Sequence, residues 1–201
     1  MSRYEQLSVG ELTTTRESIV TFGVGTKEGV TSAVKNAYKV TERGTDVVHK
    51  TVFTFTDTPL TVADTGTGVG VKIYTFPVGR ILPLGGAGSL AITTTSVLAS
   101  TLNASSTMAW GVGSVTQAAG TTLASTEQDF IQTTAITSSA TIDVAGAAAA
   151  GVGLAVVTPF AGVSTATALF LNFAVATATD IDADATITVT GSFNIYWSNL
   201  V

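Results

Sequence analysis

The chain has 201 residues, of which 45% are hydrophobic and 11% are charged, and its formal net charge is -5. A soluble domain usually has roughly 25% charged residues, and the acidic balance argues against a nucleic-acid-binding surface. The chain has no cysteine and a single histidine, His49, which excludes disulfides, thiolate metal sites and any two-histidine metal site within one chain.

The N-terminal region, residues 1–46, differs in charge from the rest of the chain. Seven of the nine Lys and Arg residues lie within residues 1–50, and the other two are Lys72 and Arg80. A shift this sharp indicates two regions with different roles. We predict an N-terminal arm or anchoring region over residues 1–46. It should contact a partner and should not be needed for the folding of the domain that follows.

Residues 27–41 (KEGVTSAVKNAYKVT) are compatible with one short amphipathic helix within this region. Its apolar stripe would consist of Val30, Val34, Ala37 and Tyr38. The Thr, Val and Gly content lowers the helix propensity of the segment. The alternative is an arm that becomes ordered against a partner.

From residue 47 onward the sequence is typical of an all-β domain. Runs rich in Val, Ile, Phe and Thr alternate with groups of Gly, Pro and Asp. The predicted strands before residue 145 are 47–56, 70–76, 89–95, 108–116 and 140–144, and the predicted turns are 57–59, 64–66, 84–86 and 119–120. We predict an all-β sandwich or barrel over residues 47–201.

Two glycine-rich stretches superficially match phosphate-binding loops. Residues 65–71 (TGTGVGV) lack the G-x-G-x-x-G spacing and the following helix of a dinucleotide-binding fingerprint. Residues 23–29 (GVGTKEG) lack the G-K-[ST] ending of a P-loop. We predict hairpin or arm glycines at both places and no cofactor.

Three residues have side chains suited to catalysis. Glu127 and Asp129 could be drawn as an acidic pair for hydrolysis, but without a cleft any acidic pair in the chain would qualify equally. A Ser-His-Asp triad would have to include His49. No G-x-S-x-G elbow is present, and we predict that His49 is an ordinary strand-edge residue. The sequence therefore predicts a protein that is not an enzyme and has no catalytic residue.

The most hydrophobic run is AGAAAAGVGLAVV at residues 145–157. With Val144 it gives 14 uncharged residues, whereas a membrane-spanning helix needs about 20, and its glycines lower helix propensity further. We predict a Gly/Ala-rich connection that leads into a buried strand at residues 154–157, and no membrane segment.

An apolar run of this length is not expected on a free surface. If it is neither in a membrane nor exposed, it belongs to the core or to a subunit interface. We predict that part of residues 145–163 lies at a subunit contact, with Val152, Leu154 and Val156 as interface candidates.

The two last predicted strands have the clearest patterns. Residues 167–176 (TALFLNFAVA) are apolar on both faces, as in a central strand buried between two layers. Residues 185–199 (ATITVTGSFNIYWSN) alternate between apolar and polar positions, as in a strand with one face on the core. Gly191 indicates a bulge or bend, and the alternation places Tyr196 and Trp197 on opposite faces.

Three alternating carboxylates precede the last strand, at Asp180, Asp182 and Asp184. The spacing resembles the start of a calcium loop, but the sixth position is Ala185 and the twelfth is Gly191, which excludes an EF-hand. The two remaining readings are a hard-cation site and a solvated acidic turn, and we predict the turn.

The chain contains 37 Thr residues. Their branched side chains favour β-strands, and their hydroxyl groups make the outer face of a sheet polar without adding charge. Free monomers normally protect their sheet edges with charges. The composition therefore predicts that much of the surface contacts other protein.

Three segments, in this order, carry a family resemblance: KTVFTFTDTPLTVADTGTGVGVKIYTFPVGRI, MAWGVGSVTQAAGTTLASTEQDFI and ALFLNFAVATATDIDADATITVTGSFNIYWSNL. They resemble tailed-bacteriophage head structural proteins of the decoration or cement type, over about residues 48–201. The resemblance implies a β-sandwich or jelly-roll-like module, often trimeric, bound to the outer surface of the major capsid protein. It carries over no catalytic residue.

Together these observations predict a non-enzymatic virion structural protein that decorates or cements a phage capsid, forms a homotrimer and contacts neither nucleic acid nor membrane. The N-terminus lacks the basic-then-apolar order of a secretory signal, so synthesis in the host cytoplasm is expected. Two alternatives stay open: a tail, neck or fibre component of the virion, and a carbohydrate-binding or adhesin module.

Overall fold

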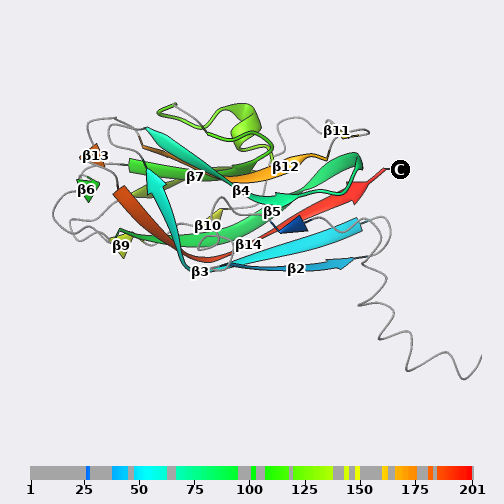
Figure 1. Ribbon diagram of the computed structural model, residues 1–201, viewed down its shortest axis with the longest axis horizontal. Coiled ribbons are helices and arrows are strands. Elements are labelled where there is room, and N and C mark those ends of the chain that lie inside the picture. Colours follow the sequence, from blue (N-terminus) through cyan, green and yellow to red (C-terminus); the bar gives the residue numbers. More distant parts are fainter. Residues whose placement is uncertain are drawn as a thin grey trace, which may run out of the picture.

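The computed structural model consists almost entirely of β-strands arranged in two facing sheets (Figure 1). It describes residues 26–27, 38–44, 48–62, 67–94, 101–102, 107–117, 120–137, 143–144, 148–149, 160–162, 166–175, 181–182 and 185–200. Within these ranges there is one short 3-10 helix, η2 (Ser125–Glu127), and no helix long and apolar enough to cross a membrane. The predicted all-β sandwich is confirmed.

Both sheets are antiparallel throughout. The five-stranded sheet has the order β1 (Thr26–Lys27), β4 (Gly68–Thr75), β12 (Ala168–Val175), β7 (Thr107–Gly113) and β8 (Ile131–Thr137). The seven-stranded sheet has the order β10 (Ala148–Ala149), β5 (Gly79–Thr94), β14 (Ala185–Asn199), β3 (Val48–Val62) and β2 (Tyr38–Gly44), and β9 (Asp143–Val144) and β11 (Phe160–Gly162) also pair with β5. Strands β6 (Thr101–Leu102) and β13 (Ile181–Asp182) form a separate pair.

The core lies between the two sheets and is rich in aromatic side chains. Phe193 of β14 stacks on Phe53 of β3, with ring centroids 4.8 Å apart, and lies 6.2 Å from the ring of Trp110 in the facing sheet. Tyr74 of β4 meets Phe53 edge to face at 5.7 Å. Burying a large apolar side chain contributes about 1.5–3 kcal/mol, so these contacts across the interior hold the two layers together.

Strand β14 confirms the alternation predicted for residues 185–199. Val189, Phe193, Ile195 and Trp197 are buried, whereas Ser192 and Tyr196 are exposed. The strand is central in the seven-stranded sheet because it pairs with β3 on one side and β5 on the other.

Strand β12 confirms the prediction for residues 167–176. It lies between β4 and β7, and it is buried on both faces from Leu171 to its last residue. One face packs on the core, and the other is covered by residues 114–117 and 120–129, described below.

Two stretches predicted as turns are β-bulges inside long strands, so these predictions are wrong. In β3, Thr56 and Asp57 together oppose Thr190, because Val189 pairs with Thr58 and Gly191 pairs with Phe55. Asp57 adopts a φ of 47°, and its amide donates a hydrogen bond to Thr190 Oγ1 over 3.3 Å. The Thr190 hydroxyl is also 3.1 Å from Asp57 Oδ1, and Asp is one of the few residues other than Gly that adopt this left-handed conformation. The bulge predicted at Gly191 is confirmed, with the extra residue on the neighbouring strand.

The second bulge lies at Leu84 in β5. Tyr196 pairs with Gly85 and Trp197 with Pro83, so Leu84 is the extra residue. A bulge uses the same Gly, Pro and Asp residues as a turn but leaves the strand continuous. Strands β3 and β5 are consequently longer than the predicted ranges 47–56 and 89–95.

The edge strand β2 replaces the C-terminal end of the helix predicted over residues 27–41. Residues 38–44 pair with β3 in regular antiparallel register, and Tyr38 is 3% exposed within the core. The sandwich therefore begins no later than Tyr38, and the predicted boundary after residue 46 falls inside the hairpin of β2 and β3.

The remaining strand predictions have mixed outcomes. Strands β4 and β7 overlap the predicted ranges 70–76 and 108–116, but β4 runs from Gly68 to Thr75 and β7 from Thr107 to Gly113. Within 140–144, the described part is the two-residue strand β9. The strand predicted at 154–157 and the turn at 64–66 lie outside the described residues. Strand β8, which the sequence analysis did not predict, forms one edge of the five-stranded sheet.

Candidate functional site

Three features of the described chain bring polar side chains together: a segment that covers one sheet, a buried cluster at one edge of the sandwich, and the outer face of the seven-stranded sheet. The first is residues 114–117 and 120–129, called here the covering segment, which lies on the outer face of the five-stranded sheet. The strand face beneath it is lined by glycines: Gly68 and Gly70 of β4, and Gly111 and Gly113 of β7.

These glycines allow the covering segment to lie directly on the sheet. A Cβ atom at Gly70 would lie 2.3 Å from Thr116 Oγ1, and one at Gly113 would lie 2.4 Å from the carbonyl oxygen of Thr126. The hairpin role predicted for residues 65–71 is therefore wrong for Gly68 and Gly70, which are strand residues. Close packing of the backbone explains them without any bound phosphate.

Asn172 of β12 holds the covering segment in place. This side chain is fully buried, and its Oδ1 accepts a hydrogen bond from the Gln117 amide over 2.9 Å. Its Nδ2 donates to the carbonyl oxygens of Val115 and Glu127, over 2.9 and 2.8 Å. One side chain thus fixes both ends of the segment, in agreement with the rule that buried polar groups are hydrogen-bonded.

Replacing Gly70 with alanine is expected to lower the free energy of unfolding by about 1–3 kcal/mol, the usual cost of overpacking. The new methyl group would lie 2.5 Å from Asn172 Oδ1 and 2.6 Å from the Gln117 amide nitrogen, the two atoms of one hydrogen bond. Chemical denaturation measures the loss. Gly120→Ala is the matched control in the same segment, since its nearest atom is 3.0 Å away. An equal loss in both variants would contradict the close-packing argument.

The acidic pair weighed in the sequence, Glu127 and Asp129, lies inside the covering segment, where each carboxylate accepts hydrogen bonds. Glu127 Oε2 accepts a hydrogen bond from the Ala124 amide over 2.6 Å, at the start of η2. Asp129 accepts two hydrogen bonds from Ser114, one from its amide over 2.9 Å and one from its hydroxyl over 2.6 Å. Both carboxylates therefore shape the loop.

Burial raises the pKa of Asp129 above its ordinary value of 3.8, while the hydrogen bonds from the Ser114 side chain and backbone oppose the rise. A raised folded-state pKa means that the folded protein binds the proton more tightly than the unfolded chain does. This group therefore favours folding below its ordinary pKa, and the advantage is lost as the pH rises through the folded-state pKa.

The variant Asp129→Asn is expected to be more stable than the natural protein at neutral pH, with a difference that shrinks as the pH falls toward 3.8. The amide cannot ionise, and its oxygen still accepts the Ser114 amide hydrogen. Thermal unfolding at several pH values measures the difference. Parallel stability curves for the two proteins would show that the ionisation of Asp129 does not affect folding.

The second feature is a buried cluster around the single histidine. His49 Nδ1 and Glu42 Oε1 lie 2.9 Å apart, and the two side chains are 3% and 5% exposed. The Tyr74 hydroxyl donates to the other Glu42 oxygen. The His49 ring stacks on Trp197 with centroids 4.0 Å apart. His49 is therefore a core residue, and the prediction of an ordinary strand-edge residue is wrong.

This cluster joins the edge strand β2 to the facing sheet. Glu42 lies on β2, His49 on β3, and Tyr74 on β4 of the five-stranded sheet. A second hydrogen bond, from the Tyr38 hydroxyl to the Ile73 carbonyl over 2.6 Å, connects the same two strands, β2 and β4. The geometry indicates a structural role at the edge of the sandwich.

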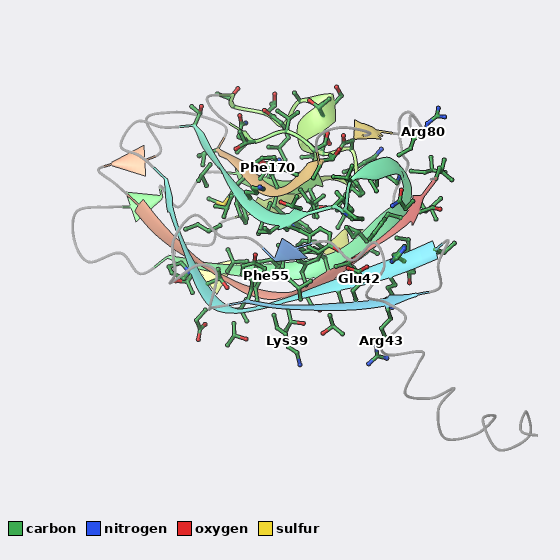
Figure 2. The ribbon with its side chains drawn as sticks, turned by 45° about the vertical axis from the view of Figure 1, so that its right-hand side comes forward. Lys39, Glu42, Arg43, Phe55, Arg80 and Phe170 are labelled. Atoms are coloured by element: carbon green, nitrogen blue, oxygen red, sulfur yellow. The ribbon has the colours of Figure 1, made fainter. Side chains whose placement is uncertain are left out.

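The third feature is a row of side chains on the outer face of the seven-stranded sheet, called here the basic row: Arg43, Lys50, Tyr196 and Leu84. Arg43 of β2 pairs with Lys50 of β3, which pairs with Tyr196 of β14. Tyr196 pairs with Gly85, next to the bulged Leu84. Figure 2 shows Arg43 pointing away from the sandwich together with Lys39.

Two members of this row are exposed large hydrophobic residues. Tyr196 is 38% exposed and Leu84 is 43% exposed, whereas the neighbouring Trp197 is fully buried. The predicted placement of Tyr196 and Trp197 on opposite faces is thus confirmed. Among the side chains that the structure describes, Tyr196 is the one exposed aromatic, so this part of the chain presents no cluster of aromatics for a sugar ring.

The metal and interface candidates fall largely outside the described residues. Asp180 and Asp184 lie outside them, and Asp182 lies in β13, where the structure gives the backbone course alone. The interface candidates Val152, Leu154 and Val156 also lie outside them. In the described ranges no group of three His, Cys, Asp or Glu side chains is arranged to hold a metal ion.

The basic row was not found by the sequence analysis. The signal that pointed toward it was the concentration of Lys and Arg in residues 1–50, but the row also needs residues 84 and 196, which come together only in the sheet. In comparisons with known proteins, no family model, no curated protein and no solved structure matches this chain.

Proposed function

We propose that this protein is a non-enzymatic structural component of a bacteriophage virion, which decorates or cements the head by binding the major capsid protein. The observation that carries the proposal is the basic row, in which exposed Arg43, Tyr196 and Leu84 and half-buried Lys50 share one sheet face. Arg and Tyr are enriched among the residues that dominate protein–protein binding.

Two further observations support the proposal. The side chains best suited to catalysis are used internally, since His49 is buried against Glu42 and the carboxylate of Asp129 is held by Ser114. The segments that resemble phage head proteins, residues 50–81, 108–131 and 168–200, supply strands of both sheets and the covering segment. The resemblance therefore covers β4, β7, β12, β14 and most of β3, and leaves out β2, most of β5 and most of β8.

The proposed arrangement on the capsid is a homotrimer. Closed symmetry lets identical surfaces cover one another, and the run at residues 145–157 offers apolar side chains for this purpose. Replacing Leu154 with aspartate is expected to weaken assembly more than it destabilises the protomer. Sedimentation measures the assembly, and thermal unfolding measures the stability of the protomer.

The decisive experiment is the purification of intact particles from cells that produce the protein. The expected result is that the protein sediments with the particles in a fixed ratio to the major shell protein. A protein that stays in the supernatant as a monodisperse monomer at micromolar concentration would overturn the proposal. A low copy number would indicate a tail, neck or fibre position.

A further inference from the structure

The basic row contains a like-charge pair that the fold does not require. Arg43 and Lys50 are directly opposite each other on neighbouring antiparallel strands, where Cβ atoms lie about 4.5–5.5 Å apart. Like charges in such a pair destabilise a sheet, and cross-strand pairs affect stability by about 0.2–1 kcal/mol. A pair that costs stability is typical of a surface with a function.

Carboxylates in the described part of the chain do not neutralise this pair. The one ion pair found there is the internal pair of His49 and Glu42, and Glu42 lies on the inner side of β2, away from Arg43 (Figure 2). Lys50 instead lies over the Tyr196 ring, with Nζ 5.5 Å from the centroid. A third cation, Lys39, is exposed on the same strand face as Arg43.

The apolar neighbours of these cations indicate the kind of partner. Val48 is 43% exposed on the same strand as Lys50, and Leu84 and Tyr196 complete the row. Nucleic-acid-binding surfaces have many phosphate-contacting cations and a basic domain, whereas this chain has a net charge of -5. Arg and Tyr among few other charges are characteristic of a protein interface.

We infer that the basic row is a docking site for a protein surface that presents carboxylates beside apolar side chains, with a Glu or Asp side chain between Arg43 and Lys50. The carboxylate would relieve the repulsion between the two cations, and Tyr196 and Leu84 would contribute the apolar contact. This inference goes beyond the proposed function, because it applies whether the partner is a shell protein or another acidic protein.

The test measures binding of a fluorescein-labelled peptide with four Glu and two Leu residues in a Gly/Ser background, by fluorescence anisotropy at low ionic strength. The same peptide with Gln in place of Glu is the control probe. The full-length protein is expected to bind the Glu peptide and not the Gln peptide. Arg43→Gln combined with Lys50→Gln should weaken binding by about tenfold or more, as expected for the loss of about 1.4 kcal/mol.

The matched single variants are Arg43→Gln and Arg80→Gln, which remove the same charge at two exposed positions. Arg80 lies at the start of β5, far from Lys39 and Arg43 in the view of Figure 2. Arg43→Gln should weaken binding while its melting temperature stays the same or rises, because the like-charge pair is removed. Arg80→Gln should bind within about twofold of the natural protein.

Three results would overturn the inference. The first is no binding of the Glu peptide, or equal binding of the Gln peptide. The second is binding of a DNA duplex of about twenty base pairs at least as tightly as the Glu peptide, which would identify the basic row as a nucleic-acid-binding surface. The third is a lowered melting temperature in Arg43→Gln, which would assign Arg43 to folding. Each result is independent of whether the protein sediments with virus particles.

Discussion

A chain that lacks residues 1–46 is expected to be largely unfolded, because the deletion removes strand β2 together with its buried side chains. Tyr38 is 3% exposed, stacks on Phe55 at 5.3 Å and donates a hydrogen bond to the facing sheet. Losing a buried aromatic side chain costs about 3–5 kcal/mol. The deletion also removes Glu42 and so leaves buried His49 without its hydrogen-bond partner. The summed loss is comparable with the free energy of unfolding of a typical domain, roughly 5–15 kcal/mol.

Circular dichroism and chemical denaturation measure this outcome. A chain that begins at residue 26 is the control, because it keeps both β1 and β2, and it is expected to retain a cooperative unfolding transition. A folded chain that begins at residue 47, with a midpoint close to that of the full-length protein, would show that β2 is dispensable. That result would restore the separate arm that the charge distribution predicts for the whole of residues 1–46.

Replacing Glu42 with alanine is expected to lower the free energy of unfolding by about 2–5 kcal/mol. The Glu42 carboxylate accepts from the Tyr74 hydroxyl and is hydrogen-bonded to His49, and both the His49 and Glu42 side chains are at most 5% exposed. Each buried polar group that loses its partner costs about 1–3 kcal/mol. The variant also loses the link between β2 and the facing sheet, so the edge strand should exchange its amide hydrogens faster.

Thr41→Ala is the matched control for this prediction, since Thr41 lies on the same strand and points to the opposite face from Glu42. Its expected effect is within about 0.5 kcal/mol, as for most surface substitutions. Glu42→Gln keeps one acceptor and should fall between the two. If Glu42→Ala and Thr41→Ala unfold at the same denaturant concentration, the buried cluster does not contribute to stability.

The basic row and the buried cluster come from one short strand, which links the stability of the protein to its proposed binding. In β2, Arg43 faces outward and Glu42 faces inward, as successive residues of a strand do. Strand β2 is thereby attached to the core at Glu42 and presents a cation at the next position. Loss of Glu42 is therefore expected to weaken docking indirectly, by loosening the strand that carries Arg43.

The sequence by itself determined those features that depend on local periodicity. The alternation of residues 185–199 defined β14 with its observed bounds, and the apolar run at 167–176 identified β12 as a central strand. In both cases the side chains of one strand carry the whole signal, since successive residues point to opposite faces. The placement of Tyr196 and Trp197 on opposite faces followed from the same regularity.

Only the tertiary structure decided whether a Gly, Pro or Asp stretch ends a strand or kinks it. Residues 57–59 and 84–86 have the composition of turns, but the neighbouring β14 keeps pairing past each of them, so the chain continues as a bulged strand. A bulge is defined by the residues across the ladder. Those residues lie more than 100 positions away in the sequence, where local patterns cannot identify them.

The same reason explains why the polar sites could not be predicted. His49 and Glu42 become buried partners because Tyr74 and Trp197 pack on them from other strands, and Asn172 is explained only by the segment that covers it. The basic row assembles four strands whose register is shifted by a bulge. Composition revealed an acidic chain with its cations near one end, and the pairing of strands decided that Arg43 and Lys50 share one exposed face with Tyr196.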